Sequence, residues 1–331
     1  MSDNSDKTIL VTGVTGMQGG AVARRLRADG WRVRGLTRDP GAQRTKPLRD
    51  LGVEIVAGDL TDESSLVEPL RGVYGVFAMA TPFEKGTENE VAQGRTLGNV
   101  AARSHVRHYV YSSVGSADRK TGIPHFETKA TIERHLQSLA LPLTIIRPVY
   151  FMENFLTFAT QRTPEGLVVP VPLRGDTTLK MIAVDDVAAI TAIVFARPEK
   201  YIGKDFDIAG DELTFVDAAQ ALGAAIDEPV RYVQVPWQAV RDQNEDFYLM
   251  YDWFERKGYH ADIEDTRDLL PELLDFRAWL ARGGARGLAT TRAAGGRALA
   301  EAGAGGAALC ATPPAPSPPL GLRAALRGRR T

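Results

Sequence analysis

A short apolar run followed at once by three evenly spaced glycines is the feature that most constrains this chain. Thr8–Thr12 has the continuous apolar character of a parallel strand that is buried on both faces, and Gly13, Gly16 and Gly19 come directly after it. The segment after the glycines has the apolar period of an amphipathic helix that we expect to end at Gly30. A strand, a glycine turn and a helix in this order predict the opening unit of an α/β fold.

The same alternation continues to about residue 150. Further strands are predicted at 31–37, 53–57, 73–80, 108–113 and 143–147, with helices at 64–70, 90–104 and 125–140 between them. This order predicts a Rossmann doubly wound parallel sheet with the strand order 3-2-1-4-5-6. Beyond Pro148 the regularity loosens, with helices predicted at 184–196, 214–226 after a Thr214 cap, 247–257 and 271–281, and a strand at 206–208.

The domain division follows from these patterns. We expect an NAD(P)-binding domain over residues 7–150 and a smaller α+β C-terminal lobe over 151–282 that completes a substrate cleft. Residues 283–331 are mostly Gly, Ala, Pro and Arg, and we expect them to be disordered because they hold few large apolar side chains. Seven arginines against Glu301 leave a nucleic-acid or membrane contact of this tail as the alternative.

The overall composition excludes several classes of protein. A net charge of −1 over 331 residues provides no field for nucleic acid or an anionic membrane, so a nucleic-acid partner is not expected. Cys310 is the single cysteine, which excludes an intramolecular disulfide and favours a reducing compartment. We find no metal-binding pattern, signal peptide or membrane span, and therefore expect a cytoplasmic protein without a metal.

The glycine spacing predicts a dinucleotide site. Gly13 permits a tight turn, Gly16 lets the backbone approach a pyrophosphate, and Gly19 lets the helix pack close to the strand, while the helix N-terminus offers N–H groups to the phosphates. An ordinary strand-to-helix turn is the alternative. The residues expected at the pyrophosphate are Gly13, Thr15, Gly16, Met17, Gln18 and Gly19.

The end of the second predicted strand bears on which dinucleotide binds. An acid at this place holds the ribose 2′-OH of NAD, whereas a cation suits the 2′-phosphate of NADP. Arg38 stands there, and Lys46 could reach the same place, so NADP(H) is favoured. Asp39 keeps NAD(H) possible, although Asp39-Pro40 is typical of a turn.

Two further strand ends should line the cofactor. Asp59, followed by Leu60 after the third strand, could meet the adenine amino group; capping the next helix is the alternative. Ala80, Thr81 and Pro82 at the end of the fourth strand should lie along the cofactor.

Several spaced motifs resemble the NmrA-like family, an atypical branch of the short-chain dehydrogenase/reductase superfamily. They are Val11 to Gly20, Val33 to Asp39, Gly58-Asp59-Leu60, Gly72 to Phe77, His125 to Lys129, Arg147-Pro148, Asn154-Phe155, Trp253-Phe254, Gly258-Tyr259, Ala261-Asp262-Ile263 and Pro271 to Leu280. The resemblance covers about residues 7–281 and implies a Rossmann fold with a nicotinamide cofactor, Pro148 being among its binding residues. It also implies a mixed role, because some members are NADPH-dependent reductases and others are redox sensors that act through protein partners.

The reaction that the family pattern implies depends on His125 and Lys129. Most short-chain dehydrogenases carry Tyr-x-x-x-Lys on one helix face, and here the pattern reads His125-x-x-x-Lys129. His125 could act as the acid/base, since an imidazole titrates near neutral pH, or it could only cap or pack the helix. Lys129 is expected to bind the cofactor ribose; acting as the proton donor itself is a third possibility.

The remaining candidates surround the expected nicotinamide. Ser113 could hold a substrate carbonyl or only satisfy local backbone, and Tyr150 could face the cleft or belong to the core. Asn154 and Phe155 are expected to line the substrate pocket. Together these residues favour an NAD(P)H-dependent oxidoreductase that acts on a small planar electrophile such as a quinone or carbonyl compound. The alternatives are an NADP(H)-binding redox sensor with a protein partner and, more remotely, a tailoring enzyme for a polycyclic aromatic compound.

Overall fold

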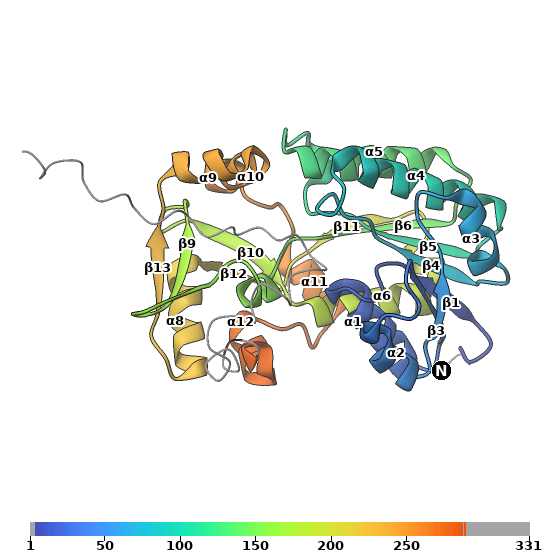
Figure 1. Ribbon diagram of the computed structural model, residues 1–331, viewed down its shortest axis with the longest axis horizontal. Helices are drawn as coiled ribbons and strands as arrows, with labels where there is room; N and C mark the ends of the chain where they lie inside the picture. The colour runs from blue at the N-terminus through green and yellow to red at the C-terminus, as the bar shows by residue number, and fades with distance from the viewer. Residues whose placement is uncertain (1–3, 287, 289–331) are drawn as a thin grey trace, which may run out of the picture.

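Seven parallel strands form the central sheet of the computed structural model, which describes residues 4–286 and 288 (Figure 1). They are β1 (Thr8–Val11), β2 (Arg32–Thr37), β3 (Glu54–Ala57), β4 (Gly75–Ala78), β5 (His108–Ser112), β6 (Leu143–Pro148) and β11 (Asp205–Ile208). Their order, β3-β2-β1-β4-β5-β6-β11, confirms the predicted Rossmann topology 3-2-1-4-5-6 and adds a seventh strand.

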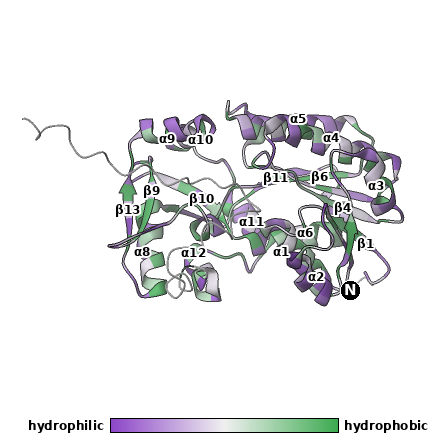
Figure 2. Cartoon of the chain, viewed as in Figure 1, coloured by the Kyte–Doolittle hydropathy of each residue, from purple (hydrophilic) through white to green (hydrophobic). Residues whose placement is uncertain are grey.

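Helices cover both faces of this sheet (Figure 1). One face carries α3 (Glu63–Leu70), α4 (Thr87–Arg103) and α5 (Pro124–Ser138), with the short turn η2 (Ala117–Arg119); the other carries α1 (Met17–Ala28), η1 (Gln43–Thr45), α2 (Lys46–Asp50) and α6 (Val184–Ala196). Successive strand residues point to opposite faces, so Ile9 and Val11 belong to one hydrophobic cluster and Leu10 to the other. In Figure 2 the central strands are mainly in hydrophobic colours and the helices outside them are of mixed colour.

The chain leaves the central sheet after β6 and later returns to it. β11 pairs in parallel with β6, placing Phe206 beside Ile146. α6 packs against the α1 side of the sheet, where Phe195 lies 6.1 Å from Trp31 between ring centroids. The predicted helix 184–196 and strand 206–208 are thus confirmed as elements. Both belong to the lobe that contains the seven-stranded sheet.

The other lobe is built from two small sheets and short helices. β7 (Tyr150–Phe151), β10 (Thr178–Ile182) and β12 (Asp211–Thr214) form one sheet; β8 (Gln161–Thr163), β9 (Gly166–Val171) and β13 (Val230–Gln234) form the other. The helical elements here and at the lobe junction are η3 (Met152–Leu156), α7 (Pro198–Tyr201), α8 (Phe215–Ile226), α9 (Trp237–Gln243), α10 (Glu245–Arg256), α11 (Ile263–Leu269), α12 (Phe276–Trp279) and η4 (Leu280–Gly284). The predicted Thr214 cap is confirmed, because its hydroxyl accepts from the Asp217 N–H at 3.0 Å.

The end of the described chain is packed against this lobe. Ala285 and Leu288 are buried in its hydrophobic cluster, and residues 289–331 of the predicted disordered tail, like residue 287, lie outside the described residues. Within the described part, no helix is long and apolar enough to cross a membrane, and no group of three or more potential ligands could hold a metal ion.

Candidate functional site

The glycine turn between β1 and α1 has the two steric features that its sequence predicts. Gly13 adopts a left-handed conformation with φ of +59°. A side chain at Gly19 would collide with the carbonyl oxygens of Thr12 and Gly13, which are backbone atoms that cannot move aside. The turn therefore brings the start of α1 against the end of β1 only because both positions lack a Cβ atom.

The start of α1, which follows the carboxyl end of β1, has no side-chain cap. Gly16 is its N-cap and provides no side-chain hydrogen bond, and the first turn, from Met17, contains no acidic residue. Thr15 lies within the turn itself, and its side chain is partly exposed. Uncapped N–H groups and the positive end of the helix dipole suit a phosphate here.

Gln18 has a different role from the other turn residues. It is buried, and its Nε2 donates a hydrogen bond to Ser112 Oγ at 2.7 Å. This contact ties the turn to the end of β5, so the Gln18 side chain already has a hydrogen-bond partner.

Arg38 and Asp59 lie at the ends of β2 and β3. Arg38 forms an exposed ion pair with Glu84 at 2.7 Å, whereas Lys46 pairs with Asp50 along α2. Hydrogen bonds from the backbone and hydroxyl of Thr61 hold the pKa of Asp59 below its ordinary value, helped by the positive charges of Lys85 and Arg38. Asp59 thus lies within electrostatic reach of Arg38, at the expected adenine end.

The helix-cap alternative for Asp59 is wrong. Asp62 caps α3, with its side chain accepting from the Ser64 N–H at 2.9 Å. Leu60, between them, is a partly buried residue packed against the hydrophobic cluster beneath α3. Asp39 accepts from the Gly41 N–H at 3.0 Å, which confirms the turn predicted at Asp39-Pro40.

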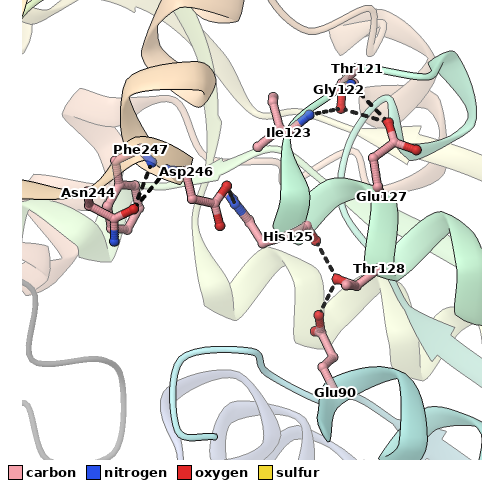
Figure 3. Close-up of polar contacts among 10 residues, drawn as sticks. All are labelled: Glu90, Thr121, Gly122, Ile123, His125, Glu127, Thr128, Asn244, Asp246 and Phe247. Atoms are coloured by element: carbon pink, nitrogen blue, oxygen red, sulfur yellow. Dashed lines mark hydrogen bonds and ion pairs between the residues drawn. The ribbon is translucent and has the colours of Figure 1, made fainter. Parts of the chain in front are cut away.

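Lys129 is fixed by a main-chain and a side-chain partner at the end of β4. Its Nζ donates to the Ala80 carbonyl at 2.5 Å and forms an ion pair with Glu90 at 2.7 Å. Glu90 is fully buried and also accepts a short hydrogen bond from Thr128 (Figure 3). The loop that begins with Thr81 and Pro82 continues from this point to the start of α4.

His125 stands one helical turn before Lys129 and contacts the other lobe. Its Nδ1 lies 2.6 Å from Asp246 Oδ1 in the first turn of α10 (Figure 3). The residue is buried, and its ring packs against Phe83, Phe126 and Phe247. The i, i+4 spacing places His125 and Lys129 on one helix face, as the sequence predicts.

Ser113 follows β5 at the same edge of the sheet. Its Oγ is buried and, among the described residues, has no hydrogen-bond partner, while its N–H donates to the Ile146 carbonyl. Its hydroxyl therefore does not serve the local backbone, which was the alternative to a substrate contact. Pro148, at the end of β6, accepts from the Gly115 N–H at 2.8 Å.

Tyr150, Asn154 and Phe155 lie farther into the second lobe. Tyr150 is buried against Phe155 and Phe215, and burial raises the pKa of its phenol well above the ordinary value. Phe155 is fully buried and also packs on Phe276, so its side chain belongs to the core of this lobe rather than to an open pocket wall. Asn154 is partly exposed, with its carbonyl accepting from Thr157 and Ala159.

Three acidic residues at the site were missed by the sequence analysis. Glu84, Glu90 and Asp246 hold Arg38, Lys129 and His125 respectively. For Asp246 a partial signal exists, because Asn244 before two acidic residues is typical of a helix start. Nothing in the sequence pairs Glu90 with Lys129 across 39 positions.

Comparisons with known proteins agree with this architecture. The chain is 31 % identical over 236 residues to a (4-alkanoyl-5-oxo-2,5-dihydrofuran-3-yl)methyl phosphate reductase of Streptomyces griseus, covering 70 % of this chain and 79 % of that protein. It is 29 % identical over 228 residues to an NAD(P)H azoreductase of Xenophilus azovorans, covering 69 % and 77 %. The crystal structure of NmrA, a negative transcriptional regulator, in complex with NADP superposes with a TM-score of 0.73 at 21 % identity, covering 88 % and 98 %. Since the model of the NmrA-like family matches residues 5–280, the chain belongs to the NmrA-like family.

Proposed function

We propose that this protein is an NADPH-dependent oxidoreductase that transfers a hydride to a small planar electrophile such as a quinone or a carbonyl compound. The observation that carries the proposal is the end of β4 and β5, where Lys129 contacts Ala80 and the buried Ser113 hydroxyl has no hydrogen-bond partner among the described residues, with His125 one helical turn from Lys129. Two relatives named as a reductase and an NAD(P)H azoreductase support it.

The residues present fit a dinucleotide. Gly13, Gly16 and Gly19 carry no Cβ atom beside the start of α1, whose N–H groups have no side-chain cap and would be the donors to a pyrophosphate. Arg38 would bind the 2′-phosphate of NADPH once it releases Glu84, which is why we propose NADPH over NADH. Asp59 would face the adenine, with Ala80, Thr81, Pro82 and Pro148 along the rest of the cofactor.

The reaction end would use five residues in separate roles. When bound, NADPH supplies the hydride. The Lys129 ammonium group donates to the Ala80 carbonyl and pairs with Glu90, and its third N–H would hold a ribose hydroxyl. Ser113 would donate to the substrate oxygen, and His125 would supply the proton; a quinone could also take that proton from water. Asn154 would border the substrate, and Tyr150 would support the pocket from the apolar core behind it.

The test is turnover. NADPH consumption should be followed with a panel of quinones, aldehydes and azo compounds, with matched reactions containing NADH. We expect turnover of at least one acceptor and a preference for NADPH. Tight NADPH binding without turnover of any acceptor would overturn the proposal.

A redox sensor is the second candidate, and one observation favours it. His125 occupies the position where most short-chain dehydrogenases carry the catalytic tyrosine, and the NmrA structure, a transcriptional regulator, has a similar fold. A sensor should enter different complexes with NADP⁺ and with NADPH. Size-exclusion chromatography and affinity capture with each form would show this, and identical behaviour in both would reject the sensor.

A further inference from the structure

His125 and Asp246 are 121 positions apart in the chain and come from different lobes. Figure 3 shows the imidazole reaching from α5 toward the first turn of α10, where the Asp246 carboxylate meets it. The hydrogen bond is at Nδ1, with a length of 2.6 Å. The Nε2 atom lies on the opposite edge of the ring from this contact.

Asp246 is itself held in place by the local structure of α10. Asn244 caps this helix, and its side-chain oxygen accepts from the N–H groups of Asp246 and Phe247 at 2.9 and 3.3 Å (Figure 3). A carboxylate in the first turn of a helix is stabilised by the positive end of the helix dipole. The acid is therefore presented to His125 by a fixed helix end rather than by a free loop.

The surroundings make this contact more than an exposed ion pair. The His125 ring lies edge-on to Phe126 at 4.8 Å between centroids, and within 6.2 Å of Phe83 and Phe247. Apolar neighbours offer no competing hydrogen bond, and they lower the local dielectric, which strengthens the contact between imidazole and carboxylate. A hydrogen bond at one ring nitrogen decides which nitrogen carries the proton in the neutral ring.

We propose that Asp246 is a positioning residue for catalysis: it keeps the proton of neutral His125 on Nδ1, so that Nε2 exchanges a proton with the substrate. This inference rests on the proposed oxidoreductase function. In carbonyl reduction, the hydride forms a C–H bond and oxidises NADPH to NADP⁺. The carbonyl oxygen takes the Nε2 proton of the imidazolium. The other proton stays on Nδ1, which continues to donate it to the Asp246 carboxylate. Water then returns a proton to Nε2.

The experiment compares Asp246→Asn and Asp246→Glu with wild type and with a neighbouring control. Glu245→Gln is that control, because Glu245 is exposed and pairs with Arg241 on the side of α9. Nitrogen-15 NMR of histidine-labelled protein reads the tautomer of His125, whose signals are assigned by their loss in His125→Gln. Kinetics separate kcat from the Kd of NADPH.

In wild type, Glu245→Gln and Asp246→Glu, we expect the neutral His125 ring to carry its proton on Nδ1. Asp246→Asn should move a large part of it to Nε2 and lower kcat for carbonyl reduction about 10- to 100-fold, with the Kd of NADPH changed less than twofold. An unchanged tautomer in folded Asp246→Asn overturns the inference whether or not there is turnover. A shifted tautomer with unchanged kcat also overturns it but leaves the oxidoreductase standing. Wild type without turnover overturns the proposed function and, with it, the proton-transfer role.

Discussion

The two ends of the proposed cofactor site are built in opposite ways. The pyrophosphate end, residues 13–19, is one continuous turn that acts through backbone groups and the absence of side chains. The reaction end, formed by His125, Lys129 and Ser113, acts through side chains, and the partners of His125 and Lys129 come from distant parts of the chain. We therefore expect the pyrophosphate end to lose NADPH affinity when a single methyl group is added within it. The reaction end should be impaired when a distant partner residue is removed.

The largest effect is expected at the pyrophosphate end. In Gly19→Ala the new methyl group would meet backbone oxygens of Thr12 and Gly13, so the turn must open. Overpacking of this kind costs about 3 kcal/mol, and we expect the Kd of NADPH to rise at least about 100-fold. Calorimetric titration and urea unfolding measure both. Gly20→Ala is the control, since its nearest contacts are 3.2 Å away and one is the flexible end of Arg24. Equal affinity of Gly19→Ala and Gly20→Ala would contradict the comparison.

At the reaction end, Lys129→Met should destabilise the fold through its partner. It leaves the fully buried Glu90 carboxylate without its counter-ion, and breaking such a pair costs about 3 kcal/mol. Adding Glu90→Gln should restore most of the stability, because the uncompensated charge is gone. NADPH affinity should stay about tenfold lower in the double variant, since the ribose contact is still missing. Full recovery of affinity together with stability would show that Lys129 has only a structural role.

The same contrast explains what the sequence could predict. Gly13 and Gly19 were interpretable because strand, turn and helix are neighbours in the chain, and the spacing alone carries the steric requirement. The partners of His125 and Lys129 depend on tertiary packing: the sequence marks Asp246 only as part of a helix start, and Glu90 carries no local signal. Phe155 was misplaced for a related reason: an aromatic residue after a strand suits a pocket wall or a core, and the contact with Phe276 that decides between them spans 121 positions. The short strands of the second lobe, such as β8 and β12, were missed because few residues carry their pattern.

A third test concerns the junction of the two lobes and the dependence of its stability on pH. Glu153 accepts from the Val184 N–H at the start of α6 and from Trp279 Nε1 at the end of α12. Burial raises its pKa from 4.5 to about 7. Between these values the unfolded state releases the proton and the folded state keeps it, so stability falls as pH rises from 4.5 to 7. The residue is partly exposed, and we expect a loss of about 2 kcal/mol.

Urea unfolding at pH 4.5 and 7.5 measures this loss, and Glu153→Gln isolates it because a neutral amide has no proton to release in this range. The variant should lose stability less steeply than wild type as pH rises. Parallel pH profiles for the two proteins would mean that Glu153 does not titrate differently on folding. The affinity for NADPH should not follow this pH dependence, because the partners of Glu153 are Val184 and Trp279 and not residues of the glycine turn.

The adenine end offers a smaller effect on cofactor choice. Arg38→Ala should raise the Kd of NADPH about 30-fold, equivalent to about 2 kcal/mol for a lost hydrogen bond to a charged group. The Kd of NADH should change less than twofold, because NADH lacks the 2′-phosphate. Lys46→Ala is the matched control, since Lys46 pairs with Asp50 instead. Equal losses for both cofactors would place Arg38 outside the 2′-phosphate site.

The smallest effect concerns Glu84, which pairs with the Arg38 guanidinium at 2.7 Å and would compete there with the 2′-phosphate of the proposed cofactor. Both side chains are substantially exposed, and exposed ion pairs contribute at most about 1 kcal/mol. Glu84→Gln should therefore tighten NADPH binding by up to about fivefold while leaving NADH unchanged, and added salt should narrow the difference because it screens the pair that is lost. A gain shared by both dinucleotides would mean that Glu84 acts on the shape of the loop after β4 rather than on Arg38. In that case the adenine end would resemble the reaction end, with a distant residue setting its geometry, and only the glycine turn would remain a site that its own few residues define.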